Sequence, residues 1–196
     1  MWPIFVAAGI ALTAIGKAIY ENYFSNKEKK AKREWQENRE KVEKFISQQE
    51  IKIEELTSKT NTEEDFYKLT DIHFTSMRIA DKAYQLFDYS KIYLEAMNRN
   101  LKLTADRKNK IHSLFKSKIE YEKKLKLTKE LNELNEVRKA LFGDKDTLKK
   151  QTDDLKIKLK SFNIRTSTLK FRIRDNCGEK GIDWFERLEQ RKKNRK

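Results

Sequence analysis

Proline, glycine, cysteine and histidine are all scarce in this chain of 196 residues. It has one proline and five glycines, and these are the two residue types that most strongly interrupt or end helices. Only three of the glycines follow the first 24 residues: Gly143, Gly178 and Gly181. We therefore expect nearly all of the remaining chain to be helical, and the predicted fold class is all-α.

The lack of cysteine and histidine restricts the chemistry that the chain can perform. Cys177 is the single cysteine, so one chain cannot form a disulfide framework, and this fits a reducing compartment. His73 and His112 are far apart and have no metal-ligand spacing. The sequence contains no phosphate-binding glycine loop and no nucleophile elbow. We expect no enzyme activity, no cofactor, no metal site and no small-molecule substrate.

Long apolar runs are confined to the N-terminus, where residues 2–16 carry no charged side chain. A helix of about 20 mostly apolar residues spans a bilayer, and this run reaches that length if Lys17 snorkels to the interface. We interpret residues 1–24 as a transmembrane anchor with aromatic residues at both interfaces and small residues at helical spacing. Such spacing also permits self-association or packing on a partner helix. The anchor residues are Trp2, Pro3, Ala7, Ala11, Ala14, Ala18 and Tyr20.

A basic segment follows the apolar run, with five basic residues and one acidic residue at positions 27–33. The positive-inside rule then places the N-terminus outside and the body in the cytoplasm, which suggests a bacterial inner-membrane protein. A cleaved signal peptide, an interfacial helix and a helix buried in the fold are alternatives for the apolar run. The side chains expected to contact anionic lipid headgroups are Lys27, Lys29, Lys30, Lys32 and Arg33.

The formal net charge is +14, and it is distributed unevenly. Residues 101–130 carry 10 basic and 4 acidic side chains, and residues 165–196 carry 11 and 5. Basic segments of this kind indicate contact with anionic lipid or nucleic acid. We regard nucleic acid as a possible partner but do not favour it over a membrane and a helical protein.

Residues 25–60 are predicted to form a stalk, with a helix from 26 to about 59. Its apolar residues form one narrow seam on an otherwise polar helix, and Gln49 fills a gap in that seam. Thr62, with Asp65 three positions on, is a plausible N-cap for the next helix. The seam consists of Trp35, Val42, Ile46, Ile53 and Leu56.

Residues 63–98 are predicted to form the core helix. Leu69, Ile72, Ser76, Ile79, Ala83, Leu86, Ser90, Tyr93 and Met97 follow one stripe, and Phe66, Met77, Ala80, Tyr84, Phe87 and Leu94 follow a second. Because the apolar arc is wide, we expect this helix to pack on two neighbours. We expect the helix to end at Asn98–Asn100 and Thr104 to cap a basic helix over 105–142, which would pair with 63–98 as an antiparallel hairpin.

A heptad repeat extends over residues 127–173 and indicates a coiled coil with another chain or an intramolecular bundle. Its unbroken phase favours one helix, whereas Gly143 followed by Asp-Lys-Asp favours a turn. Of these two interpretations we favour the turn. The predicted association seam consists of Leu127, Leu134, Leu141, Leu148, Leu155, Phe162 and Leu169.

Residues 176–181 give the strongest loop signal, and residues 182–191 are predicted to form a short amphipathic helix followed by a basic tail. This end could dock on a membrane, nucleic acid or a partner protein. Alternatively, its aromatic residues close the end of the bundle, which is the interpretation we favour. The docking candidates are Trp184, Phe185, Arg191, Lys192 and Lys193.

The predicted organisation is an anchor at 1–24, a juxtamembrane stalk at 25–60, an elongated helical bundle or coiled coil at 61–174 and a C-terminal amphipathic helix at 175–196. We expect a membrane-anchored scaffold or adaptor that forms a homo-oligomer or recruits a helical protein partner. A membrane-tethered nucleic-acid-binding protein is one alternative. An envelope-spanning or membrane-remodelling protein, similar in organisation to a phage lysis spanin, is the other and requires the opposite topology.

Overall fold

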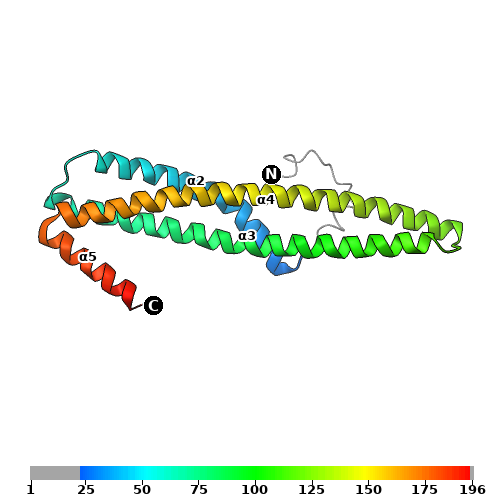
Figure 1. Ribbon diagram of the computed structural model, residues 1–196. Coiled ribbons are helices and arrows are strands. Elements are labelled where there is room, and N and C mark those ends of the chain that lie inside the picture. The colour runs from blue at the N-terminus through cyan, green and yellow to red at the C-terminus, as the bar shows by residue number, and fades with distance from the viewer. Residues whose placement is uncertain (1–22, 195–196) are drawn as a thin grey trace. The chain divides into compact units, whose positions relative to one another are not determined.

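The computed structural model describes residues 23–194, and these residues form an all-α helical bundle of four packed helices (Figure 1). The helices are α2 at Asn26–Thr57, α3 at Phe66–Phe115, α4 at Tyr121–Asn176 and α5 at Gly178–Lys193. A short 3-10 helix, η1, spans Glu63–Asp65 before α3.

The predicted membrane anchor lies almost entirely outside the described residues. This holds for its defining residues, Trp2, Pro3, Ala7, Ala11, Ala14, Ala18 and Tyr20. Between residues 23 and 194, none of the helices combines the length and the apolar character required to cross a bilayer. The anchor therefore remains a prediction from the sequence.

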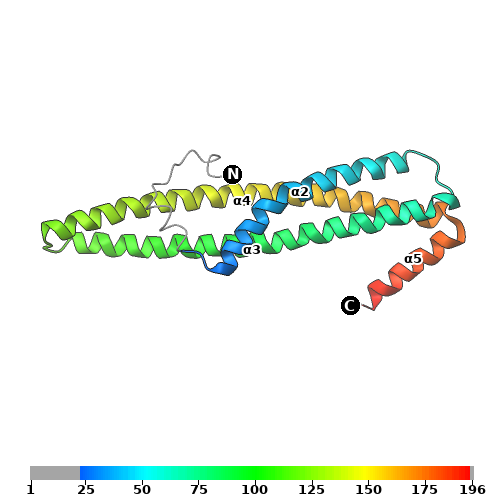
Figure 2. The same cartoon turned by 180° about the vertical axis from the view of Figure 1, so that it is seen from behind.

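The bundle divides into two compact units, and α2, α3 and α4 contribute a segment to each. Unit 1 contains the described residues up to Trp35 together with Asp88–Thr152. Unit 2 contains Gln36–Phe87 and Asp153–Lys196, and so includes α5. Within each unit the segments of α3 and α4 lie side by side and antiparallel, as the two opposite views show (Figures 1 and 2).

Unit 1 is held together by apolar packing and by ion pairs between helices. Trp35 of α2 is buried, and its indole nitrogen donates to the side-chain oxygen of Gln151 on α4 at 3.3 Å. At the α3–α4 turn, a small cluster of buried residues is covered by partly buried apolar neighbours. The buried members are Ile111, Leu127 and Leu134.

Unit 2 buries the predicted seam of α2 against the core stripe of α3 and the heptad residues of α4. Val42, Ile46, Ile53 and Leu56 are all buried, which confirms the seam. Gln49 is 4 % exposed and donates to the carbonyl oxygen of Ile72 at 3.0 Å and to the hydroxyl of Ser76 at 3.3 Å. The polar residue in the seam is thus satisfied by two acceptors on α3.

The predicted start of the core helix is also confirmed. Thr62 and Asp65 form a capping box, in which the backbone N–H of Thr62 donates to the Asp65 carboxylate at 3.0 Å. This box begins η1, and α3 follows directly. A capping box satisfies amide groups that would otherwise have no partner at a helix start, so this local pattern identifies the boundary well.

The predicted helix end at Asn98–Asn100 is wrong, because α3 continues to Phe115. Met97, Asn100 and Thr104 are each fully buried along one face of the helix. The Thr104 hydroxyl does not cap a new helix but donates to the carbonyl oxygen of Asn100 at 2.9 Å, within the same helix. Burial of this face outweighs the weak helix propensity of asparagine.

The hairpin turn lies within a segment that was predicted to be a continuous helix. Residues 116–120 connect α3 to α4, so the predicted helix over 105–142 and its pairing with 63–98 are wrong. The turn contains neither glycine nor proline. It is formed by backbone hydrogen bonds from Lys116 to Ser113 and from Ser117 to Leu114, which tighten the end of α3.

The predicted turn at Gly143 is also wrong, because α4 is continuous from Tyr121 to Asn176. Leu141 and Leu148 on either side are buried in one phase of the heptad repeat. Asp144 accepts a hydrogen bond from the Tyr93 hydroxyl at 3.1 Å and pairs with Lys32 at 3.9 Å. A glycine inside a helix costs only about 1 kcal/mol relative to alanine, and this packing outweighs that cost.

Candidate functional site

The first two turns of α2 expose a uniformly basic surface. Their single acidic residue, Glu28, is 9 % exposed and points toward α3, where Arg99 binds both of its carboxylate oxygens at 2.6 and 2.9 Å. Lys32 also points inward, toward Asp144 and the ring of Tyr93. The basic face that remains exposed consists of Lys27, Lys29, Lys30 and Arg33.

Local hydrogen bonds fix the orientation of this basic face. The backbone N–H of Ser25 donates to the Glu28 carboxylate at 2.8 Å, and the N–H of Glu28 donates back to the Ser25 hydroxyl at 3.4 Å. The hydrogen bond from the Arg99 guanidinium lowers the pKa of Glu28 to about 2. Four of the five predicted headgroup contacts therefore share the exposed side, and Lys32 does not.

The heptad seam of α4 is used within the chain. Its seven residues are each no more than 7 % exposed, although the sequence analysis offered them as an association seam. The seam residues are thus buried within the bundle of this chain, and association with another chain through them stays a prediction. The residues concerned are Leu127, Leu134, Leu141, Leu148, Leu155, Phe162 and Leu169.

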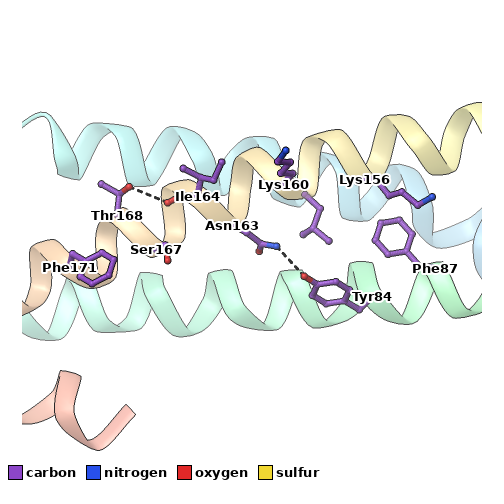
Figure 3. A pocket seen from close by; sticks show the side chains of 10 residues that line it. Tyr84, Phe87, Lys156, Lys160, Asn163, Ile164, Ser167, Thr168 and Phe171 are labelled. Atoms are coloured by element: carbon purple, nitrogen blue, oxygen red, sulfur yellow. Dashed lines mark hydrogen bonds between the residues drawn. The ribbon is translucent and has the colours of Figure 1, made fainter. Parts of the chain in front are cut away.

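Unit 2 contains a solvent-open groove between α3 and α4, with a volume of about 590 Å³ (Figure 3). Tyr84 crosses part of it, and its hydroxyl accepts a hydrogen bond from the Asn163 amide at 3.1 Å. Tyr84, Ile164 and Phe171 are 52 %, 60 % and 44 % exposed, so the groove leaves large apolar side chains in water. The α3–α4 groove is lined by Tyr84, Phe87, Lys156, Leu159, Lys160, Asn163, Ile164, Ser167, Thr168 and Phe171.

The charged side chains that line the α3–α4 groove are both basic and both come from α4. Lys156 and Lys160 lie one turn apart on α4. Lys156 also contacts Asp153 of its own helix at 3.1 Å, in an exposed pair of the kind that contributes about 0–1 kcal/mol. The groove therefore combines an apolar floor with a positively charged rim.

The predicted docking residues of α5 separate into a packed group and an exposed group. The ring of Trp184 contacts His73 edge-on at 5.1 Å, and the ring of Phe185 lies 5.7 Å from Phe171. Lys170 lies over the Phe185 ring at 4.5 Å. Arg191, Lys192 and Lys193 are exposed. The aromatic residues thus pack on unit 2, and the basic residues remain available.

His73 is the most deeply buried titratable group of this contact. It is 4 % exposed, and its burial together with the nearby charge of Lys170 lowers its pKa to about 4. Its Nδ1 atom and the Nε1 atom of Trp184 are buried and have no hydrogen-bond partner among the described residues. Neutral His73 is therefore the form compatible with the docked α5.

Cys177 connects α4 to α5 and is completely buried. Its thiol donates to the carbonyl oxygen of Thr62 at 3.5 Å, and burial raises its pKa. The described residues contain no group of three or more His, Cys, Asp or Glu side chains placed to hold a metal ion. The thiol is thus part of the packing between α5 and the start of α3.

Comparison of the chain with protein-family models, with curated proteins and with solved structures finds no match. The basic face and the C-terminal aromatic residues are visible in the sequence, whereas the α3–α4 groove was not predicted from it. The second apolar stripe of the core helix was the available signal, because Tyr84 and Phe87 belong to it and line the groove.

Proposed function

We propose that the chain is a membrane-tethered helical scaffold that recruits a helical protein partner. In this proposal residues 2–24 insert in the bilayer and the helical body lies on the cytoplasmic side. The partner binds on the exposed surface of the bundle, since the heptad seam is occupied by the chain's own helices.

The observation that carries the proposal is the basic face of α2. It comes directly after the predicted anchor, and the only acidic residue among these positions, Glu28, is turned into the bundle. A basic residue near an anionic membrane surface contributes about 1 kcal/mol. The four residues together correspond to about 4 kcal/mol, or roughly a thousandfold in membrane partitioning.

Membrane fractionation of cells that express tagged variants tests the tether. We expect the full chain in the membrane fraction and a variant lacking residues 2–22 in the soluble fraction. Charge reversal of the basic face (Lys27→Glu, Lys29→Glu, Lys30→Glu and Arg33→Glu) should reduce correctly oriented insertion. The matched control reverses four other exposed lysines, three on α2 (Lys41, Lys44 and Lys52) and Lys59 just after it. Retention of the deletion variant in the membrane fraction at the level of the full chain would contradict the proposal.

The orientation needs a separate test, and the native thiol is unsuitable for it because Cys177 is buried. Gln190 is exposed on α5 and offers a replacement position. We expect a Cys177→Ser, Gln190→Cys variant to react with a membrane-impermeant thiol reagent only after the cells are permeabilised. Reaction in intact cells would place the body outside and favour the envelope-spanning alternative.

Nucleic-acid binding is a second candidate, favoured by the exposed lysines around the α3–α4 turn. Lys116, Lys118, Lys123, Lys124 and Lys126 are all exposed there. This function predicts an affinity for DNA or RNA that falls steeply as salt rises. Binding that is weak and independent of salt would eliminate it.

A further inference from the structure

The way in which α2 packs shows what kind of helix the paired segments of α3 and α4 in unit 2 accept. The segment of α2 in unit 2 buries an apolar stripe and places acidic residues along its edge. Glu43 pairs with Lys158 of α4 at 3.1 Å, and Glu54 pairs with Arg165 at 3.1 Å. The apolar stripe of α2 thus packs on apolar residues, and the acidic residues beside that stripe pair with basic side chains of α4.

The α3–α4 groove presents a second combination of the same kind. Lys156 and Lys160 rim it on α4, and the α3 residues that line it, Tyr84 and Phe87, are uncharged. The lining residues of α4 extend from Lys156 to Phe171, which corresponds to about 22 Å of helix, or roughly four turns. The groove is therefore long enough to hold a helix of about two heptads.

We propose that the α3–α4 groove binds an amphipathic helix of a partner protein, whose apolar stripe is flanked by acidic residues that pair with Lys156 and Lys160. The helix would cover the exposed rings of Tyr84 and Phe171, as amphipathic helices do in hydrophobic grooves. This inference names the class of partner for the scaffold and in that respect rests on the proposed function.

A second copy of the described part of the chain fits the groove less well. The acid-flanked stripe of α2 is already buried in its own unit, through Val42, Ile46 and Ile53. The free end of α5 is basic, at Arg191–Lys193, and would meet Lys156 and Lys160 with like charge. Charge complementarity therefore favours a partner helix that is acidic.

The binding test uses the full chain in lipid nanodiscs and a labelled synthetic peptide of about four heptads with Leu at a and d and Glu at e and g. We expect saturable binding by fluorescence anisotropy and none by the same peptide with Lys at e and g. Lys156→Glu with Lys160→Glu should weaken binding at least about tenfold, because the charge pairs become repulsive. Tyr84→Ser should also weaken it, because it removes apolar contact.

The matched control is Lys41→Glu with Lys44→Glu, which makes the same change of charge at exposed positions of α2 outside the groove. Equal loss of binding in the control and the groove variant would overturn the proposal, as would unchanged binding in the groove variant. Sedimentation velocity without peptide tests whether a second copy of the chain occupies the groove. A dimer that the groove variants convert to monomer would identify a second copy as the occupant and overturn a partner helix.

Circular dichroism of each variant establishes that the helices are retained. Membrane fractionation of the Lys156→Glu, Lys160→Glu variant then separates the two proposals. We expect this variant to lose peptide binding and to associate with the membrane normally. If only the tether proposal is wrong, peptide binding by the unsubstituted groove would still be observed.

Discussion

Arg99 of α3 binds both carboxylate oxygens of Glu28 of α2, with nitrogen–oxygen distances of 2.6 and 2.9 Å. The Nη2 atom of Arg99 also donates to the backbone carbonyl oxygen of Tyr23 at 3.3 Å. This arrangement attaches the first turn of α2 to α3 within unit 1. It also turns the only acidic side chain of residues 27–33 away from the surface and so defines the basic face.

Glu28→Gln should destabilise the protein, because it leaves the Arg99 guanidinium without its anionic partner. Arg99 is half exposed, so solvent screening reduces the effect to about 1 kcal/mol of unfolding free energy. Urea unfolding at neutral pH measures it. The Arg107–Glu130 pair of the same unit is more exposed on its acidic side, so Glu130→Gln should cost less, about 0.5 kcal/mol.

The same pair makes stability depend on acid pH. The pKa of Glu28 is about 2 in the folded protein and about 4.5 ordinarily, so the folded state favours the carboxylate. Its stabilising contribution is present above pH 4.5 and is lost as the pH falls toward 2. Unfolding free energies measured across this range should fall less steeply in Glu28→Gln. A slope unchanged by the substitution would contradict the assignment.

His73 should make unit 2 sensitive to a different pH range. Its pKa is about 4 when folded and about 6.5 ordinarily, so the folded state favours the neutral ring. Stability is complete above pH 6.5 and declines as the pH falls toward 4, by about 3 kcal/mol in total. His73→Phe should remove this decline, because phenylalanine cannot take up a proton.

The measurement for His73 is urea unfolding between pH 7 and pH 4, monitored by tryptophan fluorescence in a Trp35→Phe background that reduces the signal from unit 1. His112 is exposed on α3, and His112→Gln serves as the control. If the loss of stability at low pH persists in His73→Phe and disappears in His112→Gln, then His112 and not His73 is responsible for it.

Gly143→Ala should stabilise the protein by about 0.5–1 kcal/mol, because alanine has the higher helix propensity and α4 is continuous at this position. The contrasting substitution is Gly178→Ala. Gly178 has a φ of 58°, and a Cβ there would overlap the Glu63 carboxylate, so this change should destabilise. Thermal or urea unfolding compares the two. Destabilisation by Gly143→Ala would indicate a turn at that position after all.

Cys177 should react slowly with thiol reagents in the native protein and rapidly after α5 detaches. Gly181→Ala should accelerate the reaction of Cys177 in the native protein. A Cβ at Gly181 would overlap the carbonyl oxygen of Ile173 and so weaken the packing of α5 on the rest of unit 2. The labelling rate measured under native conditions reports this local opening. Rapid reaction of the unsubstituted protein at neutral pH would contradict the burial of the thiol.

The local patterns of the sequence predicted those features that depend on nearby residues. The all-α class follows from the shortage of helix-breaking residues. The α2 seam from Trp35 to Leu56 and the capping box of Thr62 and Asp65 are both present. These features depend on helical spacing or on hydrogen bonds across three positions, so a single sequence contains the information for them.

The tertiary structure decided where the long helices end and which surfaces remain free. Asn98–Asn100 and Gly143 look like breaks, yet burial of their neighbours keeps α3 and α4 continuous, whereas residues 116–120 form a turn without glycine or proline. The heptad repeat was visible in the sequence, but α2 and α3 cover it, and the exposed surface lies instead along Tyr84 and Lys160. The reason is physical: periodicity predicts that a helix face is buried, whereas the identity of the segment that buries it depends on contacts between residues far apart in the chain.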